Sequence, residues 1–107
     1  MAGSLKDLAL ARLGDPALIP KTVARAGYVS VRRLHRLFAD DGLTFSRWII
    51  EQRLRRCRDD LADPRLRDLT TAEIAARRGF RSAAHFSRAL RERHGVTPVS
   101  YRRLPPH

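Results

Sequence analysis

The chain of 107 residues has little cysteine and few aromatic residues, and it contains no long apolar run. Its single cysteine, Cys57, excludes a disulfide framework and a thiolate metal cluster, and it fits a reducing cytosol. No apolar run approaches the ~18 residues that a membrane span needs. No basic start followed by an apolar stretch comes after Met1, so the sequence predicts no signal peptide. We therefore expect a cytoplasmic protein.

Strand signals are scarce as well, because β-branched residues are sparse and nowhere alternate with polar ones over a strand's length. Helix-capping signals are frequent. Ser30, Thr44, Ser82 and Thr97 each precede a helical pattern, and the pairs Ser4–Asp7 and Thr70–Glu73 have capping-box spacing. The sequence predicts an all-α fold of about seven helices, over residues 4–13, 20–26, 30–39, 44–62, 69–79, 81–95 and 97–104.

Acidic residues are the scarcer charge, with 11 Asp and Glu against 22 Lys and Arg, which gives a net charge of +11. Only two of the basic residues, Lys6 and Lys21, are lysines. A GC-rich genome explains the preference for arginine over lysine, but it does not explain the excess of positive charge. A polyanion, first of all nucleic acid, is the favoured partner over a merely soluble basic surface.

Catalytic and metal-binding patterns are missing. The chain has no Gly-rich phosphate loop, and no histidine has a second ligand-type residue at metal spacing. The adjacent pairs Asp40–Asp41 and Asp59–Asp60 are most simply explained by helix termination and surface charge. We expect no enzyme activity, no cofactor and no metal.

An internal repeat is present. Val23 and Ala24 match Ile74 and Ala75 at an offset of 51 residues. At an offset of 52, four residues of the segment 30–38 match their counterparts in 82–90, and at 53 the segment 42–44 matches 95–97. Each copy is a short helix with a small buried residue, a tight turn and a longer Ser-capped helix, which is the pattern of a helix-turn-helix. The chain thus predicts two recognition helices, about 30–39 and 82–93.

The repeat also predicts the domain organisation: a first subdomain over 1–43, a linker helix over 44–62 and a second subdomain over 63–107. A helix of that length spans about 28 Å at 1.5 Å per residue. Successive major-groove windows on one face of B-DNA lie ~34 Å apart. A rigid linker of this size suits the insertion of both recognition helices into successive major grooves of one duplex.

The second copy, IAARRGFRSAAHFSRALRERHGVTPVSYRR, resembles the DNA-binding domain of AraC/XylS-type transcription regulators. In both, a Gly-Phe turn precedes a Ser-capped helix and a Gly-x-Thr-Pro-x-x-Tyr-Arg stretch follows. The similarity covers about residues 5–103. It implies seven helices, two helix-turn-helix units joined by a long helix, and a sequence-specific double-stranded DNA-binding domain of a bacterial regulator acting on the nucleoid. It also implies a sensing or dimerisation domain, so this chain is either a stand-alone small member or one domain of a longer protein.

The resemblance assigns base-contacting residues by position. On the first recognition helix they are Arg32, His35 and Arg36, and on the second they are Ala84, His85 and Arg88. For Arg36 and Arg88 the alternative is a phosphate contact or solvation. Arg32 could equally contact a phosphate, and His35 and His85 could donate to either a base or a phosphate. Ala84 cannot hydrogen-bond a base, so a contact there is apolar, for instance to a thymine methyl group. The residues expected at phosphates are Ser30, Arg33, Thr44, Arg81, Ser82 and Thr97.

The first unit departs from the family pattern at its turn. The family glycine should stand at Tyr28, but this chain has Gly27, one residue earlier. The departure predicts a first turn of different conformation. The alternative function is a module that recruits RNA polymerase or a partner domain and binds DNA only weakly.

Overall fold

The computed structural model describes residues 3–103, and this range is entirely helical apart from turns and loops. None of its helices is both long and apolar enough to cross a membrane. The elements are α1 Gly3–Leu10, α2 Pro20–Ala26, α3 Val31–Asp40, α4 Phe45–Ala62, the 3₁₀ helix η1 Pro64–Leu66, α5 Thr71–Arg77, α6 Ala83–His94 and α7 Pro98–Arg102. The predicted all-α fold with seven α-helices is confirmed.

Side-chain caps fix where most of the helices begin. The hydroxyl oxygens of Ser30, Thr44, Ser82 and Thr97 each accept a hydrogen bond from the backbone N–H three residues later, at 3.0–3.2 Å. Thr70 and Glu73 form the predicted capping box. The prediction for the first helix is wrong, because α1 already begins at Gly3 and ends at Leu10, which places Ser4 inside the helix. The caps matter for function because they set the starts of α3 and α6.

The turns of the two helix-turn-helix units have the same conformation, which makes the expectation of a different first turn wrong. Tyr28 has a φ of +56° and Gly79, at the equivalent repeat position, has a φ of +93°. In each unit the next residue donates its N–H to the carbonyl of the small helix residue, Val29 to Ala24 and Phe80 to Ala75, both at 3.0 Å. The two turns therefore match as far as Val29 and Phe80. The second unit then has one more residue, Arg81, before its helix cap, and the caps differ in φ, which is −73° at Ser30 and −155° at Ser82.

The packing around residue 27 explains why the glycine of the first turn stands one residue early. A Cβ atom on Gly27 would lie 2.4 Å from Cδ2 of Leu5, which is a buried residue of α1. Close packing of α1 against the end of α2 thus favours glycine at 27, because any Cβ there would displace the buried Leu5 side chain. The next residue, Tyr28, then takes the left-handed conformation that L residues with side chains rarely adopt.

Replacing Tyr28 by glycine is expected to stabilise the protein by about 0.5–1 kcal/mol. The tyrosine is 96% exposed, so little contact is lost, and relief of its positive φ outweighs the larger conformational entropy that glycine gives the unfolded chain. The control is Tyr28→Ala, which removes the ring and keeps the strain, and which should leave the urea midpoint near that of the wild type. Equal midpoints for Tyr28→Gly and Tyr28→Ala would contradict the explanation.

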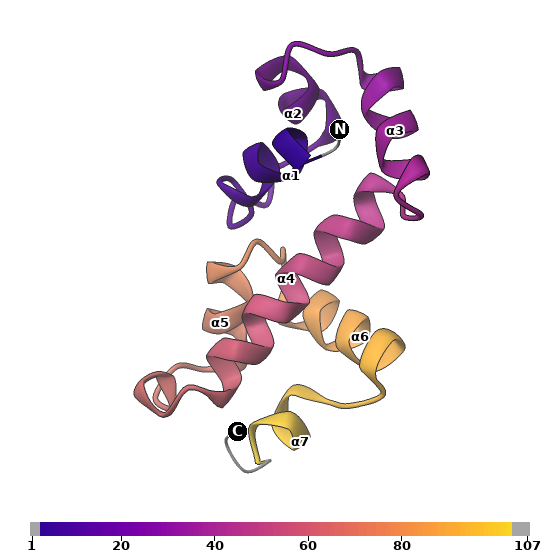
Figure 1. The fold of residues 1–107 in the computed structure, drawn as a ribbon. Helices are drawn as coiled ribbons and strands as arrows, with labels where there is room; N and C mark the ends of the chain where they lie inside the picture. The colour runs from indigo at the N-terminus through magenta and orange to yellow at the C-terminus, as the bar shows by residue number, and fades with distance from the viewer. Residues whose placement is uncertain (1–2, 104–107) are drawn as a thin grey trace.

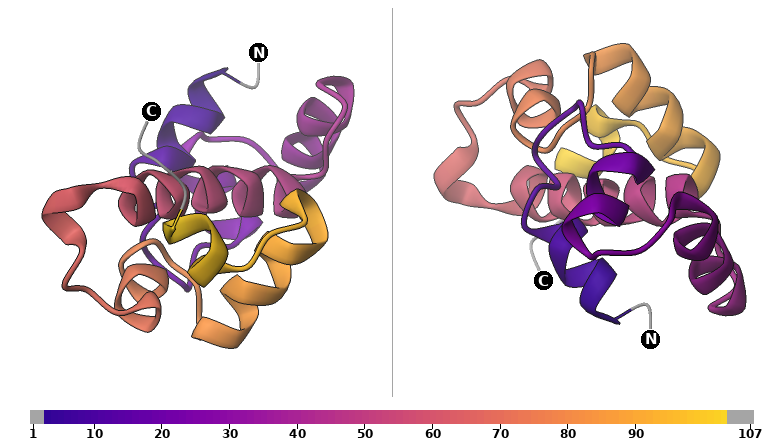
Figure 2. Two further views of the ribbon diagram at one scale, coloured as in Figure 1. Left: turned by 90° about the horizontal axis from the view of Figure 1, so that it is seen from below. Right: turned by 90° about the horizontal axis from the view of Figure 1, so that it is seen from above.

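Two separate hydrophobic cores are arranged along α4. The first includes Phe45, Trp48 and Ile49 from α4 together with residues of α1, α2 and α3. The second includes Leu54, Cys57 and Leu61 together with residues of α5 and α6. In Figure 1, α1–α3 gather around the start of α4 and α5–α7 around the rest of it. Seen from below and from above, α4 runs between these two groups of helices (Figure 2). The molecule is elongated, with extents of 42 × 24 × 22 Å.

Candidate nucleic-acid interface

The outer face of α3 carries the long polar side chains predicted for the first unit. The helix buries Leu34 and Phe38. At about 100° per residue, Arg32 and Arg36 lie on the side opposite these two, while Arg33 and His35 lie on its two flanks. All four polar residues are exposed. The structure therefore places Arg32 and Arg36 together on one outward face.

The outer face of α6 is the repeat counterpart of that face. This helix buries Phe86, Ala89 and Leu90, and it exposes Ala84 and Arg88. At the offset of 52 residues, Ala84 corresponds to Arg32 and Arg88 to Arg36. The equivalent outward positions thus hold two arginines in the first unit but one alanine and one arginine in the second.

A hollow of about 570 Å³ lies beside the outer face of α6. Its walls come from the first residue of α5, from α6 and from the start of α7, and its lining residues are Thr71, Ala83, Ala84, Ser87, Arg88, Arg91, Thr97, Pro98 and Val99. Three predicted contact residues, Ala84, Arg88 and Thr97, therefore meet in one place.

Two residues of this hollow, Ser87 and Arg91, were missed from the sequence. They lie three and seven residues after Ala84, on the same side of α6. The internal repeat could have identified them, because at the offset of 52 residues Ser87 corresponds to His35 and Arg91 to Ala39. Applying the offset to every outward position of α3 would have included them.

His85 lies away from the hollow. Its ring packs edge-on against Phe80, with centroids 5.3 Å apart and an interplanar angle of 80°, and the residue is half-buried. It lines instead a hollow on the other flank of α6 that also includes Ile50 of α4. The repeat places His85 opposite Arg33, a phosphate candidate, rather than opposite a base-contact candidate.

The phosphate candidates stand at the starts of helices. Ser30, Ser82 and Thr44 are exposed, and each of their hydroxyl oxygens already accepts from a backbone N–H, which leaves the hydroxyl hydrogen to donate outward. Thr97 differs, because its hydroxyl donates to Oγ of Ser100 at 3.0 Å. At the start of α7, it is therefore the hydroxyl of the exposed Ser100, and not that of Thr97, whose hydrogen is left to donate outward.

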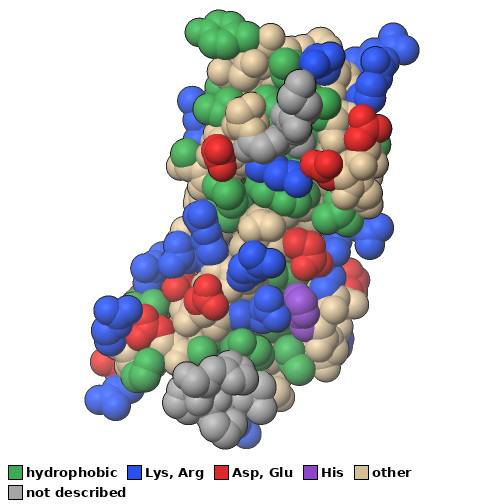
Figure 3. Space-filling model, viewed as in Figure 1, with side chains coloured by type: hydrophobic (Ala, Val, Ile, Leu, Met, Phe, Trp, Pro, Cys, Tyr) green, Lys and Arg blue, Asp and Glu red, His purple; other side chains and the backbone are tan. Residues whose placement is uncertain are grey.

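Within residues 3–103, ion pairs hold a few of the other cations but none of the predicted contact arginines. In residues 3–103, carboxylates pair with Lys6, Arg65, Arg78 and Arg93, and more distantly with His94. No carboxylate within that range forms a salt bridge with Arg32, Arg33, Arg36, Arg81 or Arg88. Figure 3 shows Lys and Arg side chains from one end of the molecule to the other. The predicted contact arginines of α3 and α6 therefore remain available to an external anion.

A buried ion pair fixes the second unit on α4. Asp60 is only 5% exposed and accepts two hydrogen bonds from Arg78, at 2.7 and 2.8 Å. This contact raises the pKa of the Arg78 guanidinium. The expectation that Asp60 serves as surface charge is therefore wrong, since it joins α4 to the end of α5 next to the turn. Burial also raises the pKa of the nearby Cys57 thiol to about 12, so this cysteine is unreactive in the folded protein.

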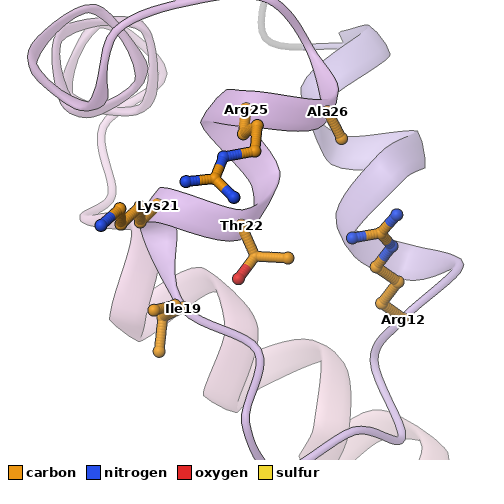
Figure 4. Close-up of a pocket in the computed structure, with 6 residues that line it drawn as sticks. All are labelled: Arg12, Ile19, Lys21, Thr22, Arg25 and Ala26. Carbon is orange, nitrogen blue, oxygen red and sulfur yellow. The ribbon is translucent and has the colours of Figure 1, made fainter.

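A basic hollow in the first unit contains none of the predicted contact residues. It has a volume of about 460 Å³, and Figure 4 shows its lining by Arg12, Ile19, Lys21, Thr22, Arg25 and Ala26. Arg12 follows α1, whereas Lys21 and Arg25 project from α2. At the repeat offset of 51 residues, Lys21 and Arg25 correspond to Ala72 and Ala76 on α5. The basic charge here is a property of the first unit alone.

Comparison with known sequences points to one family. A family model described as a helix-turn-helix domain matches residues 23–104. The chain is 34% identical over 91 residues to the transcriptional activator NphR of a Rhodococcus species, which covers 85% of this chain and 26% of NphR. It is also 34% identical over 83 residues to the transcriptional activator RhrA of Rhizobium meliloti (strain 1021), covering 77% of this chain and 26% of RhrA. The chain thus spans about a quarter of the length of these relatives.

Comparison with solved structures agrees with the sequence matches. The DNA-binding domain of AdpA, a global transcriptional factor in complex with a target DNA, superposes with a TM-score of 0.82 at 29% identity, over 94% of this chain and 87% of that one. The C-terminal domain of AraT, a response regulator from Geobacillus stearothermophilus, has a TM-score of 0.86 at 25% identity, over 94% and 82%. A regulator from Chromobacterium violaceum with an AraC-type DNA-binding domain has a TM-score of 0.77 at 30% identity, over 95% and 94%.

Proposed function

Since the chain belongs to the AraC-type helix-turn-helix family, we propose that it is a sequence-specific double-stranded DNA-binding domain of a bacterial transcription regulator. One observation carries the proposal. Two capped helices, α3 and α6, leave equivalent turns and present unpaired arginines, Arg36 and Arg88, at the same repeat position. The complex of the AdpA DNA-binding domain with its target supports duplex DNA as the ligand.

In this mechanism, α3 and α6 enter successive major grooves on one face of the duplex. Arg36 and Arg88 each donate to the O6 and N7 atoms of a guanine, which is the commonest specific contact of arginine in the major groove. Arg32 and His35 supply further donors in the first groove. In the second, Ala84 with the apolar wall of its hollow offers contact to a thymine methyl group, and Ser87 and Arg91 extend the polar surface.

Phosphate contacts position the two helices. The hydroxyl groups of Ser30, Thr44 and Ser82 donate to backbone phosphates beside helix starts, where the unsatisfied N–H groups and the helix dipole also favour an anion. Arg33 and Arg81 add charge-assisted contacts, and His85, at the repeat position of Arg33, belongs with them rather than with the base-contacting residues. At the start of α7, Thr97 acts through the hydroxyl of Ser100.

Selection of bound duplexes from a random library, followed by footprinting, tests the proposal. The selected sites should share two protected major-groove windows about one helical turn, or 10–10.5 base pairs, apart on one face of the duplex and occupied by a single chain. A single window, occupation only by a dimer, or binding without sequence preference would refute it. The last outcome, together with capture of RNA polymerase, would favour the alternative of a protein-recruiting module.

The first unit is expected to discriminate sequence more sharply than the second. Arg36→Ala should flatten base preference at one or two positions of the first half-site, with a loss of ~1–3 kcal/mol of discrimination. Arg88→Ala should weaken binding as well but change preference at fewer positions, because its neighbour at the tip of α6 is Ala84. Binding-specificity profiles of the wild type and both variants provide the measurement. A uniform loss of affinity for Arg36→Ala, with loss of base preference for Arg88→Ala, would reverse the assignment.

A further inference from the structure

The two helix-turn-helix units contact each other at the middle of α4, between the two hydrophobic cores. The first core takes its last α4 residue at Ile49, and the first fully buried α4 residue of the second core is Leu54, with the partly buried Ile50 packed against that core. Arg53 lies between them and is only 8% exposed. The junction of the two units is therefore built around a buried cation.

Arg53 is bound by backbone carbonyls of the first unit. Its Nε donates to the carbonyl oxygen of Leu13 at 3.0 Å, and one terminal nitrogen donates to that of Asp15 at 2.8 Å. Burial lowers the pKa of the guanidinium, although the charge of Asp15 opposes this effect. The side chain thus ties α4 to the loop between α1 and α2.

The same loop lies against the second unit. A Cβ atom on Gly79 would lie 2.5 Å from the Leu13 carbonyl oxygen and 2.6 Å from Nε of Arg53. A Cβ atom on Gly14 would lie 3.0 Å from the carbonyl oxygen of Arg77, the last residue of α5. Leu13, Arg53 and Gly79 therefore meet at one point, immediately before the segment that leads into α6.

We infer that Arg53 is a positioning residue that fixes the orientation of α6 relative to α3, and that it thereby restricts this domain to DNA sites of one half-site spacing. The inference rests on the proposed function. A helix fixes the distance between groups along its axis, but helices curve and bend. The carbonyl-bound guanidinium resists such bending where α4 passes from one core to the other.

The hydrogen bonds of Arg53 are better suited to fixing the relative orientation of the two units than to stabilising the fold. Hydrogen bonds to two carbonyls define a direction, whereas apolar surfaces repack when they are displaced. Their net contribution to folding is small, because the cost of burying the charge offsets much of the gain. One extra base pair between the half-sites rotates the second groove window by about 34° and moves it by about 3.4 Å. If the junction is fixed, α6 cannot follow this displacement and loses its contacts with the second groove.

The test measures affinity for the selected duplex and for duplexes whose spacer is one base pair shorter or longer. We expect the wild type to lose at least about tenfold on each altered spacer, as for a mismatched base pair. Arg53→Met keeps much of the buried volume without the two hydrogen bonds, and it should lose less than about threefold. Arg53→Lys, which keeps the charge and can donate to one carbonyl, should fall between the two and is measured should Arg53→Met not fold.

The matched control is Arg93→Met. Arg93 also binds α4, by donating to Glu51 at 2.6 Å, but this bond connects α6 to α4 and involves no residue of α1–α3. This variant should keep the spacing preference of the wild type. If Arg53→Met and Arg53→Lys keep that preference too, or if Arg93→Met loses it equally, the inference is overturned.

A second measurement needs no DNA. Spin labels on cysteines introduced at Ala39 of α3 and Ala72 of α5, both exposed, report the distance between the units, while the buried Cys57 stays unlabelled. Arg53→Met should broaden the distance distribution and Arg93→Met should not. Failure of the wild type to bind any duplex would refute the proposed function alone. An unchanged distribution in Arg53→Met would refute the positioning role alone.

Discussion

Duplex DNA binding should weaken by about 10³–10⁴-fold when the salt concentration rises from about 50 to 200 mM. The chain carries a net charge of +11, and no carboxylate of residues 3–103 pairs with the candidate contact arginines on α3 and α6. If these helices and their caps neutralise ~6–8 phosphates, the logarithm of the binding constant falls with the logarithm of salt at a slope of about −5 to −7, because condensed counterions are released. Titrations at four or five salt concentrations give the slope directly.

Single variants locate the charges responsible. Arg33→Ala should reduce the steepness of the slope by about one. Arg65→Ala is the control, because Arg65 is also exposed but already pairs with Asp63 at 3.0 Å, and it should leave the slope unchanged. A wild-type slope near zero would remove the electrostatic basis of the proposed interface.

Gly79→Ala should destabilise the protein by at least about 4 kcal/mol, a large fraction of the total for a domain of this size. Two causes act together. The φ of +93° is strained for any residue with a Cβ, and that Cβ would overlap the Leu13 carbonyl oxygen and the buried Arg53. Neither neighbour can move away cheaply, because one is backbone and the other is held by two hydrogen bonds.

Gly42→Ala separates the two causes. Gly42 has a nearly equal φ of +91°, but apart from its two chain neighbours nothing in the described part of the chain lies within 4 Å of the Cβ that alanine would add. Its substitution should cost only the strain, about 1–2 kcal/mol. Urea unfolding of both variants gives the two free energies. Equal losses would show that close packing at the junction contributes nothing.

Local signals in the sequence predicted the helices well. A Ser or Thr cap and the N–H that it accepts lie three residues apart, so the starts of α3, α4, α6 and α7 can be read from the order of residues alone. The exception is α1, where a Ser–Asp pair at capping distance lies within the helix. The repeat was visible for the same reason, because both units use the same local devices.

Long-range contacts could not be predicted in this way. Arg53 is one of twenty arginines, and nothing near it in the chain distinguishes it from the exposed Arg55. Its partners lie 38 and 40 residues earlier. Asp60 similarly pairs with a residue 18 positions away. The first turn was misjudged for a related reason, because the contact that favours glycine at 27 comes from Leu5.

The candidate site was predicted in part. Periodicity was enough to place Arg32, Arg36, Ala84 and Arg88 on outward faces. It could not show that α7 closes a hollow beside α6, which adds Ser87 and Arg91, because that depends on how the chain returns after Gly95. The half-buried position of His85 depends likewise on the packing of Phe80.

Because the two cores are separate, one residue in each of them can report the local unfolding of its own helix-turn-helix unit. Trp48 is the only tryptophan and belongs to the first core, so the intrinsic fluorescence follows the opening of that half. Cys57 is the only cysteine and belongs to the second core, so its rate of reaction with a thiol reagent follows the opening of the other half. Recording both signals on one unmodified sample dissects the cooperativity of the molecule, and duplex DNA that bridges the halves should bring the two time courses together.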